Sequence, residues 1–203
     1  MSWSLNEVEA LARKAARGAG LSWGLAEEAG RATRWLIAHG LPGAEVLSAA
    51  LTRLDGLPHD AVAPLDGWQA RDVLCPITTG AALADLGAAG GGDLRLGPVA
   101  GPLLLLPFIA PHVVTLSWDG VRLGMRDEAV ILGGAPDGVR AAIAQSVRIE
   151  TGPAEGRALP LQDRAELDAE TVSRLDAFAQ RTYAPATEAS RIAGAGAGLA
   201  DND

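Results

Sequence analysis

Apolar residues recur with a helical period at the start of the chain. The positions that share one helical face are Leu5, Val8, Leu11, Ala12 and Ala15. Ser4 and Glu7 have the spacing of a capping box, in which each side chain accepts a hydrogen bond from the other residue's backbone amide. Gly18 and Gly20 are typical of a helix C-terminus. The pattern predicts a first helix that begins after Ser4 and ends at Gly18.

The same period predicts two further helices. The second helix runs from about residue 25 to 39, with Ser22 or Gly24 as its cap, and ends at Gly40. The third helix covers about 43–54. Because the connections between these helices are short, we expect a small antiparallel helical layer.

The middle and the end of the chain give weaker helical signals. Residues 57–70 are rich in Pro, Asp and Gly and are predicted to form a loop. A short strand is expected at 71–77, a short helix at 79–88 and another helix near 138–144. A last helix is expected over about 166–181.

After residue 93 the apolar positions change to a period near two, which is typical of strands. The predicted strands cover 94–97, 102–109, 113–118, 121–125, 129–133 and 146–151. Asp119-Gly120 lies between two alternating segments and predicts a tight hairpin turn. The apolar run at 102–114 is shorter than the roughly 20 residues that span a bilayer, so we interpret it as buried strand.

This order of elements predicts an α+β fold. An N-terminal helical layer packs on a mostly antiparallel β-sheet, and a C-terminal helix and an extended tail follow. The chain of 203 residues is expected to form a single domain over 1–203. Within it, 1–56 is the helical segment, 57–165 is mainly β, and 166–203 is the C-terminal helix and tail.

Charge and cysteine content narrow the classes of function. The formal net charge is −8, and no Lys/Arg cluster occurs along the sequence, which argues against nucleic acid and against an anionic membrane as partners. The single cysteine, Cys75, excludes a disulfide within the chain, and the N-terminus lacks the features of a signal peptide. A cytoplasmic location is therefore expected. No Cys/His spacing suits zinc, and we expect neither a metal nor a cofactor.

The sharpest match to a catalytic motif is Gly20-Leu-Ser22-Trp-Gly24, which fits the G-x-S-x-G pattern of hydrolases. That motif requires a strand before the serine, whereas a helix precedes it here. We therefore interpret Ser22 as a helix N-cap. Cys75 has apolar neighbours and is expected to be an inert buried thiol.

Two segments could contribute to a ligand site. The charges of the second helix either decorate a solvated face or form the rim of a pocket beside Trp23. Residues 181–192 either dock as an ordered strap or form a loose end, whereas 194–203 cannot be a phosphate loop because no helix can follow it. The candidate ligand-binding residues are Ser22, Trp23, Glu27, Arg31, Arg34, Arg181, Tyr183, Glu188 and Arg191.

Two stretches together resemble a known family. They are SLNEVEALARKAARGAGLSWGLAEEAGRATRWL at 4–36 and RTYAPATEASRIAGAGAGLADND at 181–203. They are similar to DUF3726, a bacterial family of unknown function whose members have about this length. The resemblance implies a soluble bacterial protein in which the helical segment and the tail belong to one module. It implies no activity, cofactor or catalytic residue.

The leading functional hypothesis is a non-catalytic or accessory domain that binds a small anionic metabolite or a partner protein, as a homodimer. One alternative is a cofactor-independent enzyme that uses Glu27, Glu28, Asp72 or Tyr183 as acid or base. A second alternative is a structural subunit or assembly factor of a larger complex. The sequence leaves all three open.

Overall fold

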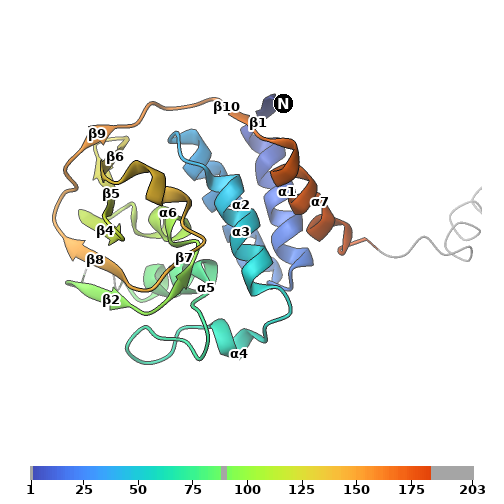
Figure 1. Cartoon of the computed structure of the whole chain (residues 1–203), viewed down its shortest axis with the longest axis horizontal. Coiled ribbons are helices and arrows are strands. Elements are labelled where there is room, and N and C mark those ends of the chain that lie inside the picture. Colours follow the sequence, from blue (N-terminus) through green and yellow to red (C-terminus); the bar gives the residue numbers. More distant parts are fainter. Residues whose placement is uncertain (1, 88–90, 184–203) are drawn as a thin grey trace, which may run out of the picture.

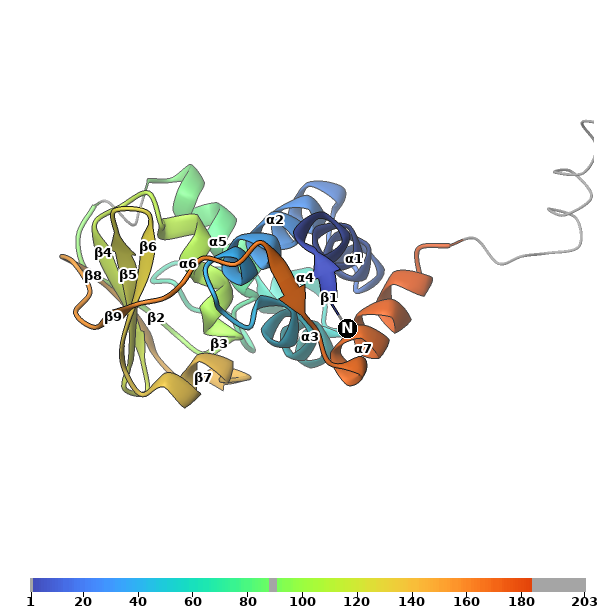
Figure 2. The same ribbon diagram turned by 90° about the horizontal axis from the view of Figure 1, so that it is seen from above.

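The computed structural model describes residues 2–87 and 91–183. Its helices are α1 (Leu5–Gly18), α2 (Trp23–Ala38), α3 (Gly43–Leu54), α4 (His59–Val62), α5 (Pro76–Asp85), α6 (Leu106–Ile109) and α7 (Ala169–Gln180). Figures 1 and 2 show α1, α2, α3 and α7 packed side by side at one end of the molecule, and a β-sheet at the other. Helices α5 and α6 lie between them. This arrangement confirms the predicted α+β class.

The starts of the first two helices follow the predicted capping chemistry. The Glu7 amide donates to the Ser4 hydroxyl at 3.3 Å, and the Ser4 amide donates to the Glu7 carboxylate at 2.8 Å, so the capping box is confirmed. The Leu25 amide donates to Ser22 Oγ at 3.4 Å, so Ser22 is the predicted N-cap of α2. Helix α3 has the predicted limits.

Small residues let the helices approach closely. The fully buried alanines of α1 and α2 that belong to the core are Ala12, Ala15, Ala16, Ala26 and Ala29. Gly18 lies so close to α7 that a Cβ built on it would be 1.8 Å from the Phe178 carbonyl oxygen. Gly18 is therefore a point of close approach between α1 and α7, as well as the last residue of its helix.

The main sheet has six antiparallel strands in the order β2-β8-β4-β5-β6-β9. They are β2 (Leu94–Leu96), β4 (Val114–Trp118), β5 (Val121–Arg126), β6 (Ala129–Gly134), β8 (Val147–Thr151) and β9 (Arg157–Ala158). Asp119 and Gly120 join β4 to β5 with positive φ angles of 44° and 84°, which confirms the predicted hairpin. A row of apolar side chains crosses the inner face, namely Leu94, Ile149, Leu116, Leu123 and Leu132.

The prediction of a strand at 102–109 is wrong. These residues form the 3-10 helix η2 (Pro102–Leu105) and then α6. Both η2 and α6 have a proline near their first residue, where a helix has no use for the backbone N–H that proline lacks. A proline inside a central strand would instead remove a hydrogen bond between strands. The four leucines at 103–106 are at most 1% exposed. Burial on all sides explains why the run has no helical period and looks like a strand.

Two other boundaries differ from the prediction. Residues 71–77 do not form a strand, because Pro76 opens α5, and the helix expected at 79–88 accordingly begins earlier. The helix expected near 138–144 is replaced by the 3-10 helix η3 (Pro136–Arg140) and the short strand β7 (Ile143–Ala144). Strand β7 pairs with β3 (Val99–Ala100).

A long connection returns the chain from the sheet to the helices (Figure 1). Its strand β10 (Arg164–Glu166) pairs with β1 (Ser2–Ser4), and this contact far apart in sequence was not predicted. Asp168 then caps α7, accepting from the Thr171 amide at 2.8 Å, so the last helix begins later than the predicted residue 166. One hydrophobic cluster contains buried residues of the helices and of the sheet.

Candidate functional site

Three arginines lie in one row across the outer face of the sheet. Arg95 of β2 is directly opposite Arg148 of β8, Arg148 is opposite Ser117 of β4, and Ser117 is opposite Arg122 of β5. We call these four residues the arginine row. All three arginines are exposed, while their strand neighbours on the inner face are buried or half-buried. The helices lie on one side of the sheet (Figure 2), and the alternating burial places the row on the other side.

The strands place these side chains by simple alternation. Each arginine is the centre of an apolar–Arg–apolar triplet, and the triplets are 94–96, 121–123 and 147–149. In each triplet the two apolar residues face the core, which turns the arginine outward. The antiparallel register then aligns the three triplets across neighbouring strands.

Two of the row's arginines have no partner in the described part of the chain. The Nε of Arg95 donates to the Ser146 hydroxyl at 3.0 Å, and the Ser117 hydroxyl donates to Glu150 at 3.3 Å. Among residues 2–87 and 91–183, no hydrogen bond, ion pair or ring contact engages Arg122 or Arg148. Both guanidinium groups are therefore free to bind an anion.

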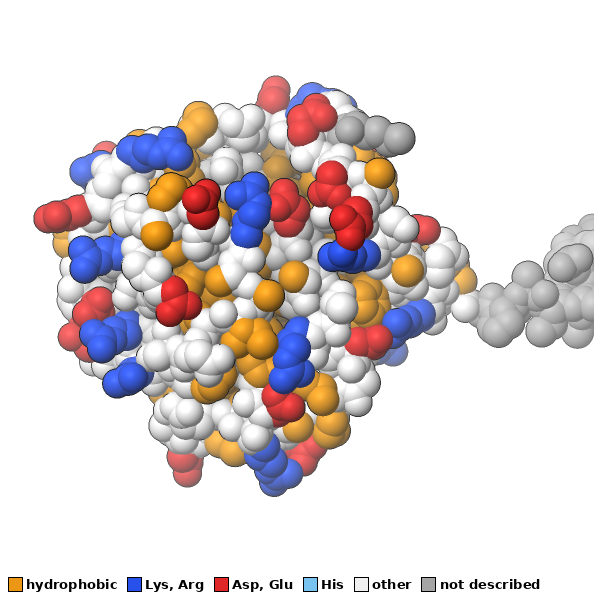
Figure 3. All heavy atoms as spheres, in the orientation of Figure 1, with side chains coloured by type: hydrophobic (Ala, Val, Ile, Leu, Met, Phe, Trp, Pro, Cys, Tyr) orange, Lys and Arg blue, Asp and Glu red, His pale blue; other side chains and the backbone are white. Residues whose placement is uncertain are grey.

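The row lines a shallow hollow of about 380 Å³. Its other lining residues include Ser146, Asp119 and Glu150. A second hollow of about 380 Å³ continues from it, shares Arg122 and Glu150, and is bounded by residues 151–153. In Figure 3 several Lys or Arg side chains follow one another down the left margin of the molecule, where the sheet lies, with Asp and Glu side chains among them.

The row is electrostatically unfavourable in the free protein. Like charges directly opposite one another on a sheet are destabilising, and Arg95 and Arg148 are such a pair. Guanidinium groups carry fixed donors that match carboxylate and phosphate oxygens. An anion held between these side chains would remove the repulsion, so the arrangement is suited to anion binding.

The two arginines of the site predicted on α2 are engaged in ion pairs. Glu28 pairs with Arg31, and Arg34 pairs with Glu9 of α1 at 3.5 Å. Trp23 is 63% exposed, and the guanidinium of Arg17 on α1 lies 5.1 Å from its ring centroid. A small cavity of about 160 Å³ is lined by Arg31, Trp35 and Glu28, the last a candidate acid or base, and by none of the other candidate ligand-binding residues.

The remaining residues predicted for the α2 site are exposed and do not converge. Ser22 and Glu27 are exposed, and Ser22 is occupied by its capping bond. The charges of α2 thus lie on a solvated helix face beside α1. A ligand-binding role for these residues stays a prediction.

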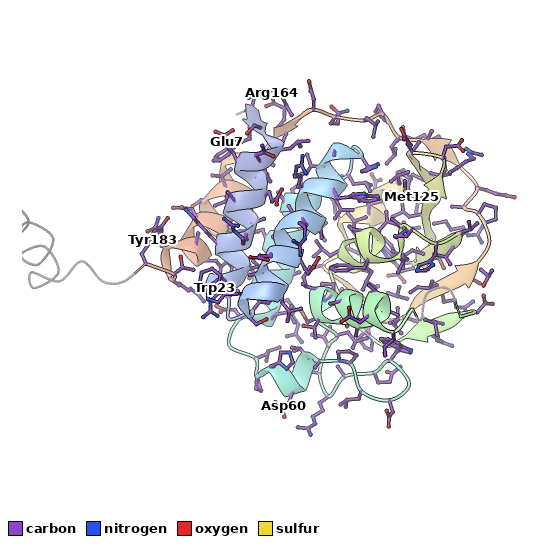
Figure 4. The ribbon with its side chains drawn as sticks, turned by 180° about the vertical axis from the view of Figure 1, so that it is seen from behind. Glu7, Trp23, Asp60, Met125, Arg164 and Tyr183 are labelled. Carbon is purple, nitrogen blue, oxygen red and sulfur yellow. The ribbon has the colours of Figure 1, made fainter. Side chains whose placement is uncertain are left out.

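The strap predicted at 181–192 is described only as far as Tyr183. The Arg181 guanidinium pairs with Asp55 after the end of α3, so it does not reach α2. The Tyr183 hydroxyl lies 3.1 Å from Lys14 Nζ, and Figure 4 shows Tyr183 and Trp23 at the same end of the helices. Glu188 and Arg191, like the glycine-rich tail, lie outside the described residues.

The Arg181–Asp55 ion pair gives a prediction for acid stability. Hydrogen bonds from Arg181 at 2.7 and 3.0 Å lower the pKa of the Asp55 carboxyl. The lowered pKa means that the stabilisation is present above the unfolded pKa of about 3.9 and is lost as the pH falls through the lower folded value. We expect Asp55→Asn to reduce the loss of stability in acid, measured by urea unfolding at neutral pH and near about pH 3. Identical pH slopes for the variant and the wild type would contradict this role.

Among the described residues, the other candidate metal ligands, nucleophiles, acids and bases do not gather into one site. Cys75 is buried at 3% exposure, as expected. No group of three or more His, Cys, Asp or Glu side chains suited to a metal occurs within 2–87 and 91–183. Asp72, proposed as an acid or base, is exposed and pairs with Arg53. The enzyme alternative stays a prediction.

A further cavity of about 390 Å³ lies where the α2–α3 turn meets the returning connection. Two of its three arginines are engaged, because Arg140 pairs with Glu45 at 2.7 Å and Arg164 donates to Ser2 at 2.7 Å. Figure 4 shows Arg164 beside Glu7 at this end of the molecule. The arginine row therefore offers more free cationic donors than this cavity.

The comparisons with known proteins bear on the helical segment. No helix in the described part of the chain is long and apolar enough to cross a membrane. No curated protein and no solved structure matches the chain. The sheet, the arginine row and the second quoted stretch at 181–203 lie outside the one matching segment. Residues 3–75 match the sequence profile of DUF3726, described as a protein of unknown function, which confirms the family resemblance for the helical segment.

Proposed function

We propose that this protein is a non-catalytic binding module that holds an anionic ligand on the outer face of its sheet. Arg148 is the centre of the proposed site, with Arg95 and Arg122 on either side along the arginine row. The ligand class is a molecule with phosphate or carboxylate groups. This retains the small anionic metabolite expected from the sequence and moves its site from α2 to the sheet.

The observation that carries the proposal is the alignment of three arginines of which two have no partner among the described residues. Several arginines elsewhere on the surface have carboxylate partners, for example Arg53 with Asp72 and Arg71 with Asp60, both at 2.6 Å. In a chain with a net charge of −8, carboxylates are plentiful partners. A row that leaves cations directly opposite one another therefore favours an external anion.

Serine hydroxyls add uncharged donors to the same surface. Ser146 accepts a hydrogen bond from Arg95 and keeps its own hydrogen for a bound oxygen. Ser117 donates to Glu150 at 3.3 Å and would turn away from that carboxylate to donate to the ligand. Hydrogen bonds to charged groups contribute about 1.5–3 kcal/mol each. Loss of one guanidinium contact should accordingly weaken binding about tenfold or more.

The test is a titration of the purified protein with inorganic phosphate and with citrate at low ionic strength, followed by calorimetry and by the shift in melting temperature. We expect both anions to stabilise the wild type, and Arg148→Gln to lower the affinity about tenfold or more. Arg13→Gln is the matched control, because Arg13 is an exposed arginine of α1 and the substitution removes the same charge. Circular dichroism verifies that both variants fold.

Two outcomes would reject the proposal. The first is that neither anion binds the wild type. The second is that Arg13→Gln weakens binding as much as Arg148→Gln, which would show a general effect of net charge. Loss of binding in Arg31→Gln alone would instead support the site predicted on α2.

A further inference from the structure

We infer that the ligand of the arginine row is a linear oligophosphate that lies across the strands. This inference rests on the proposed anion site and adds the class and the orientation of the ligand. It follows from the length of the row, from the residues beside it and from the absence of exposed aromatic side chains in its described lining.

The row is long enough to match several anionic groups in line. Adjacent strands are about 4.8 Å apart, so the backbones that carry Arg95 and Arg148 are about one strand spacing apart. Arg122 lies two strands from Arg148, at about 10 Å, and three strands from Arg95, at about 14 Å. One phosphate suffices for the adjacent pair, whereas a ligand with several anionic groups in line can give each of the three guanidinium groups a phosphate of its own.

The residues beside the row restrict the ligand to a narrow chain. Asp119 and Glu150 line the first hollow, and Glu150 and Glu155 line the second, so carboxylates flank the cationic strip. A broad anionic surface would bring its own charges against these carboxylates. A single chain that follows the row meets the three guanidinium groups and the Ser117 hydroxyl between two of them.

The lining offers no platform for nucleic-acid bases. Single-stranded nucleic acid is bound by aromatic side chains that stack on successive bases, in addition to basic residues. The only aromatic residue in the described lining of the two hollows is Trp118, which is buried at 3% exposure and donates its Nε1 hydrogen to the Gly138 carbonyl at 3.1 Å. The row therefore recognises the phosphate chain itself.

The experiment compares inorganic phosphate, pyrophosphate, triphosphate and a long-chain polyphosphate at constant ionic strength, by calorimetry with metal-free protein. We expect affinity per molecule to rise at least tenfold from phosphate to the long chain. Arg122→Gln should lower the affinity for the long chain about tenfold and that for phosphate by a smaller factor, because Arg95 and Arg148 are the adjacent pair and Arg122 lies two strands away. Arg148→Gln should weaken the binding of every member of the series.

Several results would overturn the inference. Affinity that does not depend on chain length would reject the linear ligand while leaving anion binding in place. Failure of phosphate and of every chain to bind would reject both the inference and the proposed function. Equal binding of an acidic peptide, poly-glutamate, would reject the phosphate class. ATP is compared with triphosphate because it carries the same phosphate chain with a nucleoside attached. Tighter binding of ATP would overturn the inference that the row recognises the phosphate chain alone. Equal or weaker binding of ATP would support that inference.

Discussion

Replacement of Gly18 by alanine is expected to destabilise the protein by about 3 kcal/mol or more, at the upper end of overpacking effects. A Cβ at this position would be 1.8 Å from the Phe178 carbonyl oxygen and 2.7 Å from the carbonyl carbon. Both atoms belong to the backbone of α7, so no change of side-chain rotamer relieves the clash. Helix α7 would have to move away from α1, which would expose the buried residues between them. Urea unfolding measures the loss.

Gly24→Ala is the control for this substitution. Gly24 lies in α2 without a positive φ, and a Cβ added to it would have no atom within 4 Å outside its own stretch of helix. Alanine favours helix more than glycine does, so we expect the free energy of unfolding to rise by at most about 1 kcal/mol. A similar loss of stability at both positions would contradict the close contact between α1 and α7.

Leu104→Ala is expected to lower the free energy of unfolding by about 2–5 kcal/mol, the range for buried leucines. Leu104 is 0% exposed in η2, which contacts α2, α3, α5 and α6. We propose that the chain unfolds as one domain, so this single cavity should lower the melting temperature of helices and sheet together. Far-ultraviolet circular dichroism and tryptophan fluorescence should report coincident transitions.

Leu161→Ala provides the matched control, since Leu161 is 62% exposed on the returning connection. We expect its effect to stay within about 0.5 kcal/mol, as for other surface substitutions. Equal effects at Leu104 and Leu161, or two separate transitions in Leu104→Ala, would contradict the shared core.

The fold could be predicted from the sequence wherever local chemistry decides the structure. The capping box at Ser4 and Glu7, the Ser22 cap and the Asp119-Gly120 turn all use contacts between residues close in sequence. The run at 102–109 could not be assigned, because complete burial erases the period that separates helix from strand. The β1–β10 pairing depends on residues more than 150 positions apart, which no local pattern indicates.

The candidate site shows the same limit. The three apolar–Arg–apolar triplets are visible in the sequence and indicate half-buried strands with outward arginines. The triplets are far apart in the chain and form no Lys/Arg cluster in the sequence. Only strand pairing aligns them, and the sequence pattern does not show which strands pair. The charges of α2 were visible because they lie one helical turn apart, yet Arg31 and Arg34 pair with carboxylates of the same chain.

The most direct measurement is the nuclear magnetic resonance spectrum of the arginine Nε–H groups and backbone amides during titration with inorganic triphosphate. The account predicts that the Nε–H signals of Arg95, Arg122 and Arg148 shift together and saturate, while those of Arg31 and Arg34 on α2 stay in place. Saturating shifts confined to α2, or signals of the arginine row that do not respond to triphosphate, would contradict it.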